Sequence, residues 1–477
     1  MCLNRFIKCF GLTNQNLNLR RHISIMNHYP EKVKQKLLSI LKNMSEYYWI
    51  FSKNPGHDFM RQDSGKLSFY DTMKLILFMG KSSTNEEIIQ YFDMDFDKIP
   101  SQSAFNQRRN QISLDAFRTL FQEFSTSFPT TTHQFKGYCI LAADGTHTVY
   151  STNPQILEDY NKPQLLEHRG YNHMHLNALV DVMSKTFLDI VIQPGQKPDE
   201  RAALHTMLDH FQPNNPETYI LTADRGYESY DLLFHCELKH MKYVFRVKEP
   251  SCRNILTTYK NELPDEEEFD IQVRRFFTTK LNEKIRKQPQ VYYYMNPSKN
   301  IPHFYDYRKG KSACYVSFRI LKIKTTDNTY EYLITNLPFS FTLEDLKECY
   351  HLRWGIETSF RYLKHSAGLL HFHSKKPEFL KQEIYATLIC YNMGTFIAHK
   401  AVIENQKKKR RSTNKWKYEI NFSLALKLVR AFLLRADTRP PVDLLQLIMK
   451  YMYPVKEKFR IFKRPLRGIS AIRFGYR

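Results

Sequence analysis

The chain has 477 residues, of which 42% are hydrophobic, so it is long enough for two or three domains with substantial cores. Its formal charge of +23 and its 14% aromatic residues indicate a polyanionic partner, because Lys and Arg gain affinity for phosphates by releasing counterions. Net charge alone does not distinguish DNA from RNA or from an anionic membrane surface.

Cysteine usage and apolar runs exclude several classes of protein. None of the eight cysteines is spaced as Cys-x-x-Cys or lies close to paired histidines, which argues against zinc modules and disulfide frameworks and fits a reducing cytosol. No apolar run approaches the roughly 20 residues that a membrane span requires. The first 25 residues lack the apolar region of a signal peptide, and Met26 could be the true start, so we expect residues 1–25 to be untranslated or disordered.

Residues 1–128 are predicted to form a helical domain. Two of its segments, at 85–92 and 101–112, are joined by a short Asp-rich turn, a pairing compatible with a DNA-binding helix-turn-helix. The second helix would then offer Arg108 and Arg109 to a DNA groove. A merely structural helical domain explains the same pattern, and both interpretations stay open.

The periodicity changes to that of strands after residue 136. An apolar run ends in Asp144, and a later run ends in Asp224, so each aspartate sits where a buried strand emerges. An Asp-Gly pair after a strand is by itself most often a turn. The order of elements between residues 138 and 248 is three strands, helix, strand, helix, strand. This order predicts an α/β ribonuclease H-like fold, a mixed sheet flanked by helices, in which the first and fourth strands bring the two aspartates together.

Residues 251–337 read as a β-rich insertion, because four strand-like segments alternate with polar, Lys-rich turns. Its basic residues could line a DNA channel, although loops of this composition are as often simply solvated. The candidates for such a channel are Arg274, Arg275, Lys287, Arg308, Lys309 and Lys311.

A single amphipathic helix is predicted over residues 343–368. At roughly 100° per residue, its polar residues Tyr350, Arg353, Glu357 and Lys364 fall within an arc of about 60°, and apolar residues occupy the other side. A charged helix face is usually just solvated. The spacing Tyr-x2-Arg-x3-Glu-x6-Lys, however, resembles the YREK signature of DDE transposases of the bacterial insertion sequence 4 family.

The resemblance covers most of residues 101–476. It implies a ribonuclease H-like catalytic core formed by residues 136–250 and 338–400, with the β-rich insertion at 251–337 between its two parts. Residues 401–477 would be a basic C-terminal helical region and tail, whose Lys and Arg runs would hold the DNA backbone non-specifically.

The resemblance also implies a metal site. Asp144, Asp224 and Glu357 would be the catalytic residues and would ligate two metal ions. Oxygen ligands without a His or Cys cluster favour Mg²⁺ or Mn²⁺ over zinc. The neighbouring His147 and His175 are expected to be structural or to contact DNA.

Cationic and aromatic side chains around this site would hold the DNA. The resemblance implies that Tyr350, Arg353 and Lys364 bind DNA phosphates. Arg225, beside the second aspartate, could act in the same way. An aromatic residue could stack on a flipped base if the ends form hairpins, but Trp354, Trp416 and many tyrosines are all conceivable for that role.

The leading hypothesis is a transposase that binds the terminal inverted repeats of its own element, cuts them and joins the ends to target DNA. A homodimer in a synaptic complex is expected, in the bacterial cytoplasm and at the nucleoid when bound to DNA, without membrane association. Two alternatives remain: a ribonuclease H-like nuclease without strand transfer, and a catalytically silent DNA-binding protein descended from a transposase.

Overall fold

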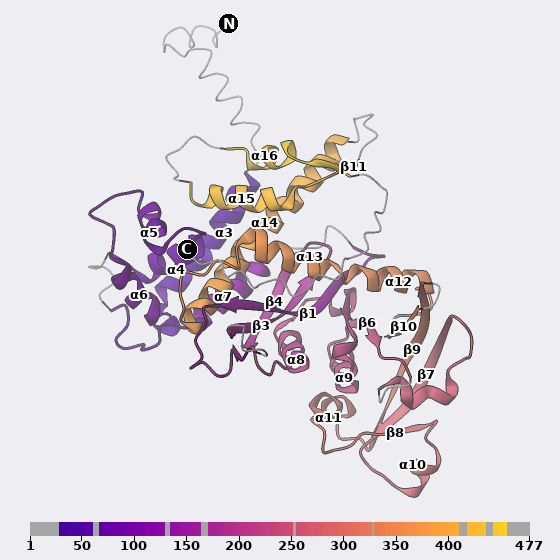
Figure 1. The fold of residues 1–477 in the computed structure, drawn as a ribbon. Coiled ribbons are helices and arrows are strands. Elements are labelled where there is room, and N and C mark those ends of the chain that lie inside the picture. The colour runs from indigo at the N-terminus through magenta and orange to yellow at the C-terminus, as the bar shows by residue number, and fades with distance from the viewer. Residues whose placement is uncertain are drawn as a thin grey trace. The chain divides into compact units, whose positions relative to one another are not determined.

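The computed structural model describes residues 28–60, 66–128, 134–163, 170–250, 254–326, 329–409, 417–435 and 442–455 (Figure 1). The chain divides into two compact units, one made of Met1–Ser127 with Tyr362–Arg477 and the other of Phe128–Arg361. The predictions for residues 1–25, for the tail after residue 455 and for Trp416 lie outside the described residues. None of the described helices is both long enough and apolar enough to cross a bilayer.

The second unit is built on a mixed sheet of ten described strands. In its central part the strand order is β4-β3-β1-β5-β6, with β1, β5 and β6 parallel and with β3 antiparallel to both β1 and β4. This is the ribonuclease H-like arrangement predicted from the sequence, with the first and fourth long strands side by side. The bounds are β1 (Cys139–Tyr150), β2 (Tyr160–Asn161), β3 (Tyr171–Asp181), β4 (Thr186–Pro194), β5 (Tyr219–Ala223) and β6 (Lys242–Val247).

Strand β1 is longer than predicted and continues through Asp144 instead of ending before it. Its pairing with β3 runs on from Asp144 opposite Ala178 to Tyr150 opposite Asn172. The sequence of this extension contains polar residues such as Thr148, which suggest a loop. Thr148 is nevertheless buried, so the backbone hydrogen bonds of the β1–β3 ladder decide the structure here.

Four further strands extend the same sheet beyond β6, in the order β10-β9-β7-β8. They come from the segment predicted as a β-rich insertion, together with two short helices. The prediction that Arg275 lines a DNA channel is wrong. Its side chain is buried, pairs with Glu262 and lies over the Tyr259 ring. The bounds are β7 (Phe269–Thr278), α10 (Glu283–Lys287), β8 (Tyr292–Tyr294), α11 (Pro302–Arg308), β9 (Ala313–Thr326) and β10 (Thr329–Thr335).

Helices cover both faces of the central sheet (Figure 1). On one face lie α8 (Glu200–His210) and α9 (Tyr230–Leu238), whose apolar residues form one buried cluster with Leu141 and Ala143 of β1. On the other face lies α13 (Gly355–Arg361), whose Phe360 ring is 5.9 Å from the ring of Phe187 in β4. Successive side chains of a strand point to opposite faces of the sheet. Ala143 points toward α8 and α9, so Asp144 points toward the opposite face.

The predicted helix over residues 343–368 is interrupted, so the prediction of one continuous helix is wrong. It consists of α12 (Leu343–Leu352), α13 (Gly355–Arg361) and a π-helical turn η5 (Tyr362–Ala367). The chain turns at Arg353 and Trp354. Gly355 then passes so close to Val182 that an added Cβ would lie 3.1 Å from the valine Cβ, so the break brings α13 onto the sheet.

The first unit is helical and joins both ends of the described chain. Its 33-residue helix α14 packs against helices from both parts of the unit. Helix α5 begins with a capping box in which Ser83 and Glu86 satisfy each other's backbone N–H groups. The bounds are α3 (Tyr29–Glu46), α4 (Phe69–Phe78), α5 (Thr84–Tyr91), α6 (Gln102–Gln111), α7 (Leu114–Ser125), α14 (Pro377–Lys409), α15 (Phe422–Leu433) and α16 (Leu444–Lys450).

The predicted DNA contact by Arg109 is wrong. Its side chain is 1% exposed, and its guanidinium pairs with Glu383 at 2.8 Å and donates to Gln382 Oε1 at 2.9 Å. Arg109 therefore links α6 to α14 inside the first unit. Arg108 is half-buried, with its guanidinium 5.3 Å from the Phe59 ring centre, and its role in DNA binding stays a prediction.

Candidate active site

The sheet register places the two predicted aspartates side by side. Ala143 of β1 pairs with Ala223 of β5 in parallel, so the next residues, Asp144 and Asp224, occupy one row across the two strands. Each aspartate Oδ1 accepts the N–H of the following residue, at 2.8 Å in Asp144 and at 2.7 Å in Asp224. These hydrogen bonds fix the orientation of both carboxylates.

Arg353 joins the predicted glutamate to this row. Its guanidinium is buried, with Nη1 3.7 Å from Asp144 Oδ2 and Nη2 3.9 Å from Glu357 Oε1. Asp224 is contacted from the same helical segment, because the Tyr350 hydroxyl donates to its Oδ1 at 3.3 Å. The three predicted carboxylates thus gather around Arg353 and Tyr350.

The electrostatics of the site reflect this crowding. The pKa of Asp144 is raised to about 6, chiefly by burial and also by the charges of Glu200 and Glu357, against the opposing effects of the Gly145 N–H and Arg353. Burial and the charge of Asp224 raise the pKa of Tyr350 to about 12 although Arg353 lowers it. Burial therefore disfavours the charged forms of both side chains at the site.

A fourth carboxylate at the site was missed by the sequence analysis. Glu200, the first residue of α8, lies so near β1 that a Cβ on Gly145 would be 2.5 Å from its Oε1. His175 Nε2 lies 3.1 Å from the same oxygen. Only a glycine fits between these groups. The one sequence signal for Glu200 is an acidic residue in the first turn of a predicted helix, which is common in helices of any function.

A second cation at the site was also missed. Arg246 of β6 follows Phe245, which pairs with Ala223 of β5, so Arg246 stands in the row of Asp224. Its Nη1 lies 3.7 Å from Asp224 Oδ1, and its Nη2 lies 3.2 Å from Glu331. An arginine inside an otherwise apolar strand is the signal that could have indicated it.

The other predicted residues fall in different places. Arg225 is exposed directly beside Asp224. Lys364 belongs to η5 in the other compact unit, and burial lowers its pKa. The rings of His147 and His175 meet edge to face with centroids 4.7 Å apart. They lie on β1 and β3, beyond Asp144.

A basic cleft of about 970 Å³ opens beside Asp224. Arg225 and Gly226 form part of its wall, and the rest comes mainly from β8 and from the chain around it. Its cationic residues outnumber its acidic ones, and three consecutive tyrosines, 292–294, stand among them. The cationic residues of the lining are Arg201, Arg225, Lys248, Arg286 and Lys299, and the acidic ones are Glu228 and Asp231.

Comparison with protein families identifies the chain. The model of the transposase DDE domain matches residues 135–393, which is more than half of the sequence and contains all four carboxylates described above. This chain belongs to the transposase DDE domain family. The match begins just before β1 and ends within α14, so the transposase domain includes the whole sheet of the second unit.

Solved structures that are similar to this chain include a transposase complex. A cryo-EM structure of a piggyBac transposase synaptic complex with hairpin DNA is similar with 11% sequence identity and a TM-score of 0.38, over 80% of this chain and 75% of that one. No curated protein matches this transposase at a significant level.

Transposase domains of this family generally use divalent metal ions, and the side chains here fit such ions. The donor set consists of carboxylate oxygens, which are the ligands of hard cations. Burial, together with Glu200 and Glu357, raises the pKa of Asp144, so the charged carboxylate is disfavoured and a bound cation would stabilise it. Among the described residues, the one set of three candidate ligands within 4.8 Å of one another is His205, His235 and His303, which lie elsewhere.

Proposed function

We propose that this transposase, of the insertion sequence 4 type, cuts the terminal inverted repeats of its element and joins them to target DNA. Asp144, Asp224 and Glu357 would hold two Mg²⁺ or Mn²⁺ ions. When bound, these ions supply activation of the attacking hydroxyl and stabilisation of the leaving oxygen in a displacement at phosphorus. The observation that carries the proposal is the convergence of the three carboxylates on the Arg353 and Tyr350 pair within a transposase domain.

The residues of the chain itself would position the DNA strand. Arg225 is exposed at the edge of the basic cleft next to Asp224, so a strand lying in the cleft would bring a phosphate to the carboxylates. Tyr292, Tyr293 and Tyr294 in the cleft wall are suited to stacking on unpaired bases. Arg353 is buried between Asp144 and Glu357, so it would orient them and reach a phosphate only from inside the site.

The test uses the full-length protein with labelled DNA that carries the inverted repeats flanking its coding region. With Mg²⁺ and a target plasmid, we expect cleaved ends and joined products. Glu357→Gln is expected to bind the DNA nearly as well as wild type and to lose both products. Glu348→Gln, a matched substitution at an exposed position of α12, should behave as wild type.

The other outcomes are informative in different ways. Cleaved ends without joined products, even from pre-cut DNA, would show a nuclease without strand transfer. DNA binding without any Mg²⁺-dependent nicking would show a silent DNA-binding descendant of a transposase. Near-normal cleavage by Glu357→Gln would refute the assignment of the third carboxylate. Synapsis predicts that two labelled ends elute together with a protein dimer.

A further inference from the structure

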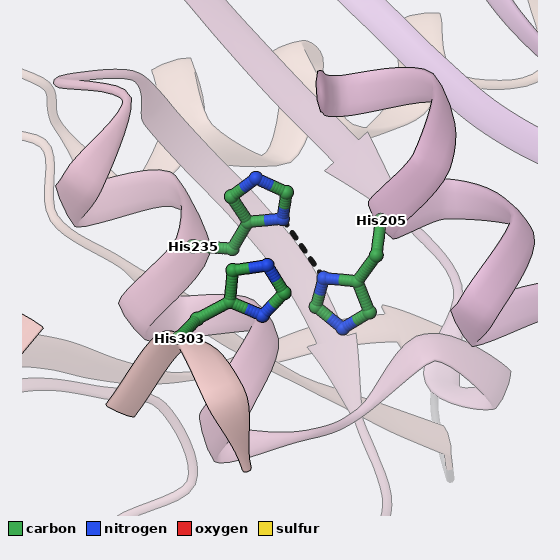
Figure 2. Close-up of side chains that lie close together, drawn as sticks. All are labelled: His205, His235 and His303. Carbon is green, nitrogen blue, oxygen red and sulfur yellow. Dashed lines mark hydrogen bonds between the residues drawn. The ribbon is translucent and has the colours of Figure 1, made fainter. Parts of the chain in front are cut away.

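Three histidines from separate helices meet away from the carboxylates. His205 lies on α8, His235 on α9 and His303 on α11, and each offers a ring nitrogen within 4.8 Å of the others (Figure 2). Nδ1 of His205 and Nδ1 of His235 are 2.8 Å apart. His235 is buried, and the other two are partly exposed, so an ion from solvent could reach the cluster.

Two of the three rings are hydrogen-bonded to carboxylates. His235 Nε2 lies 3.1 Å from Asp209 Oδ1, and His303 Nδ1 lies 2.7 Å from Asp231 Oδ2. A ring nitrogen that donates to a carboxylate leaves the lone pair of the opposite nitrogen free, so these contacts favour Nδ1 of His235 and Nε2 of His303 as ligand atoms. Carboxylate partners of this kind are characteristic of metal-binding histidines.

The closeness of the rings also favours ligation. The three rings lie nearly parallel to one another, at centroid distances of 3.8 to 5.1 Å. Three cationic rings packed this closely would repel one another, whereas neutral imidazoles leave lone pairs for a metal ion.

We propose that His205, His235 and His303 bind one zinc ion, with water in the fourth position. Imidazole nitrogen suits zinc and does not suit Mg²⁺, so this site is chemically distinct from the carboxylate site. The ion would link α11, from the segment between β6 and β10, to α8 and α9 of the central sheet. Its role would be structural: it would fix the wall of the basic cleft, to which Asp231 and Ile301 also belong.

Zinc binding is tested on the full-length protein after treatment with a chelator. Zinc chloride is titrated against a chromophoric competitor in excess Mg²⁺, which occupies carboxylate sites. We expect one zinc ion per chain and a higher melting temperature with zinc than without it. Glu357→Gln should keep this zinc ion, so failure of the proposed catalytic role and failure of the zinc site are distinguishable.

Single substitutions test which histidines bind the zinc ion. His205→Gln and His303→Gln should each lose stoichiometric zinc and the zinc-dependent rise in melting temperature. His210→Gln removes a histidine from the same helix as His205 but outside the cluster, where it contacts Asp189, and should keep both. Asp231→Asn should weaken zinc binding by about 10- to 100-fold.

Two results would overturn the proposal. One is the absence of zinc binding by the wild type in excess Mg²⁺, which would make the cluster a hydrogen-bonded stack without a metal. The other is unchanged zinc stoichiometry in the His205 and His303 variants, provided that their circular dichroism shows a folded chain. The wild-type result does not depend on whether any variant folds.

Discussion

At the scale of single residues, the carboxylates are positioned at the expense of stability. The Asp144 side chain is 27% exposed, and the charged residues Glu200 and Glu357 lie near it. Isolated charges in such surroundings are unfavourable, and the Gly145 N–H and Arg353 offset this only in part. The sequence indicated Asp144, Asp224 and Glu357 through their strand ends and spacing. For Glu200 and Arg246 the sequence held only weak signals, because their proximity to the site is created by the entry of α8 and by the strand register.

This balance predicts a pH-dependent stability. The pKa of Asp144 is raised from 3.8 to about 6, so the folded chain holds a proton that the unfolded chain releases, and stability falls as pH rises between these values. In metal-free protein at pH 7.5, Asp144→Asn should therefore raise the free energy of unfolding by about 2 to 3 kcal/mol. Below pH 3.8 the difference should vanish. Urea unfolding in chelator at both pH values measures this.

The exposed Asp115, on a helix of the other unit, provides the control. Asp115→Asn should change the unfolding free energy by less than about 0.5 kcal/mol at either pH. Equal stabilisation by Asp144→Asn at both pH values would refute the charge-based explanation, because the effect would then come from the shape of the amide.

At the scale of elements, apolar runs predicted the strands well and polar patterns predicted the helices less well. β5 and β6 are short and mostly made of apolar residues, so their type and place followed from the sequence. The break at Arg353 did not, because helical periodicity assumes that a polar residue faces solvent, whereas Arg353 turns inward to Asp144 and Glu357. The extension of β1 was hidden for a similar reason: its polar Thr148 is buried, and its backbone pairs with β3, which is distant in sequence.

The contact between α6 and α14 leads to a first prediction at the scale of elements. Arg109 and Glu383 are almost completely buried as a pair, so Arg109→Met leaves the buried Glu383 carboxylate with His373, 3.3 Å away, as its remaining side-chain partner. We expect a loss of about 3 to 5 kcal/mol in unfolding free energy. Arg108→Met on the same helix, half-buried and without an acidic partner in any described contact, should cost far less. Chemical denaturation of both variants measures the difference, and equal losses would contradict the assignment.

The basic cleft leads to a second prediction at the scale of elements. Arg286 of α10 lines it and the next residue, Lys287, does not. If a DNA strand lies in the cleft, Arg286→Ala should weaken binding and reduce the slope of log affinity against log salt by about 0.9, the value for one lost phosphate contact. Lys287→Ala should leave both nearly unchanged. Fluorescence anisotropy over a salt series decides, and equal effects of the two variants would place the strand elsewhere.

At the scale of the whole molecule, the net charge of +23 and the acidic centre serve different purposes. The excess of cations attracts a polyanion over long range, whereas the proposed catalytic carboxylates would act only on DNA that reaches them. Composition alone indicated the first property. The second required the fold, because the three carboxylates come from two strands and a helix far apart in the chain.

Charge of this size predicts strongly salt-dependent binding to DNA of any sequence. A protein with 6 to 10 phosphate contacts should lose roughly 10³- to 10⁵-fold in affinity between 50 and 200 mM salt. Glu357→Gln removes no cation, so its salt slope should equal that of the wild type. Gel-shift or anisotropy titrations measure both, and an affinity independent of salt would exclude phosphate contacts as the source of binding.

The first unit has an unusual order of assembly, because it joins Met1–Ser127 to Tyr362–Arg477. Arg109 has its partner Gln382 a further 273 residues along the chain. On the ribosome, helices α3 to α7 must therefore wait for α14, while the whole sheet of the second unit emerges and can fold between them. A truncated or stalled translation product would carry a finished catalytic sheet behind helices with exposed apolar faces, which are features that chaperones and proteases recognise.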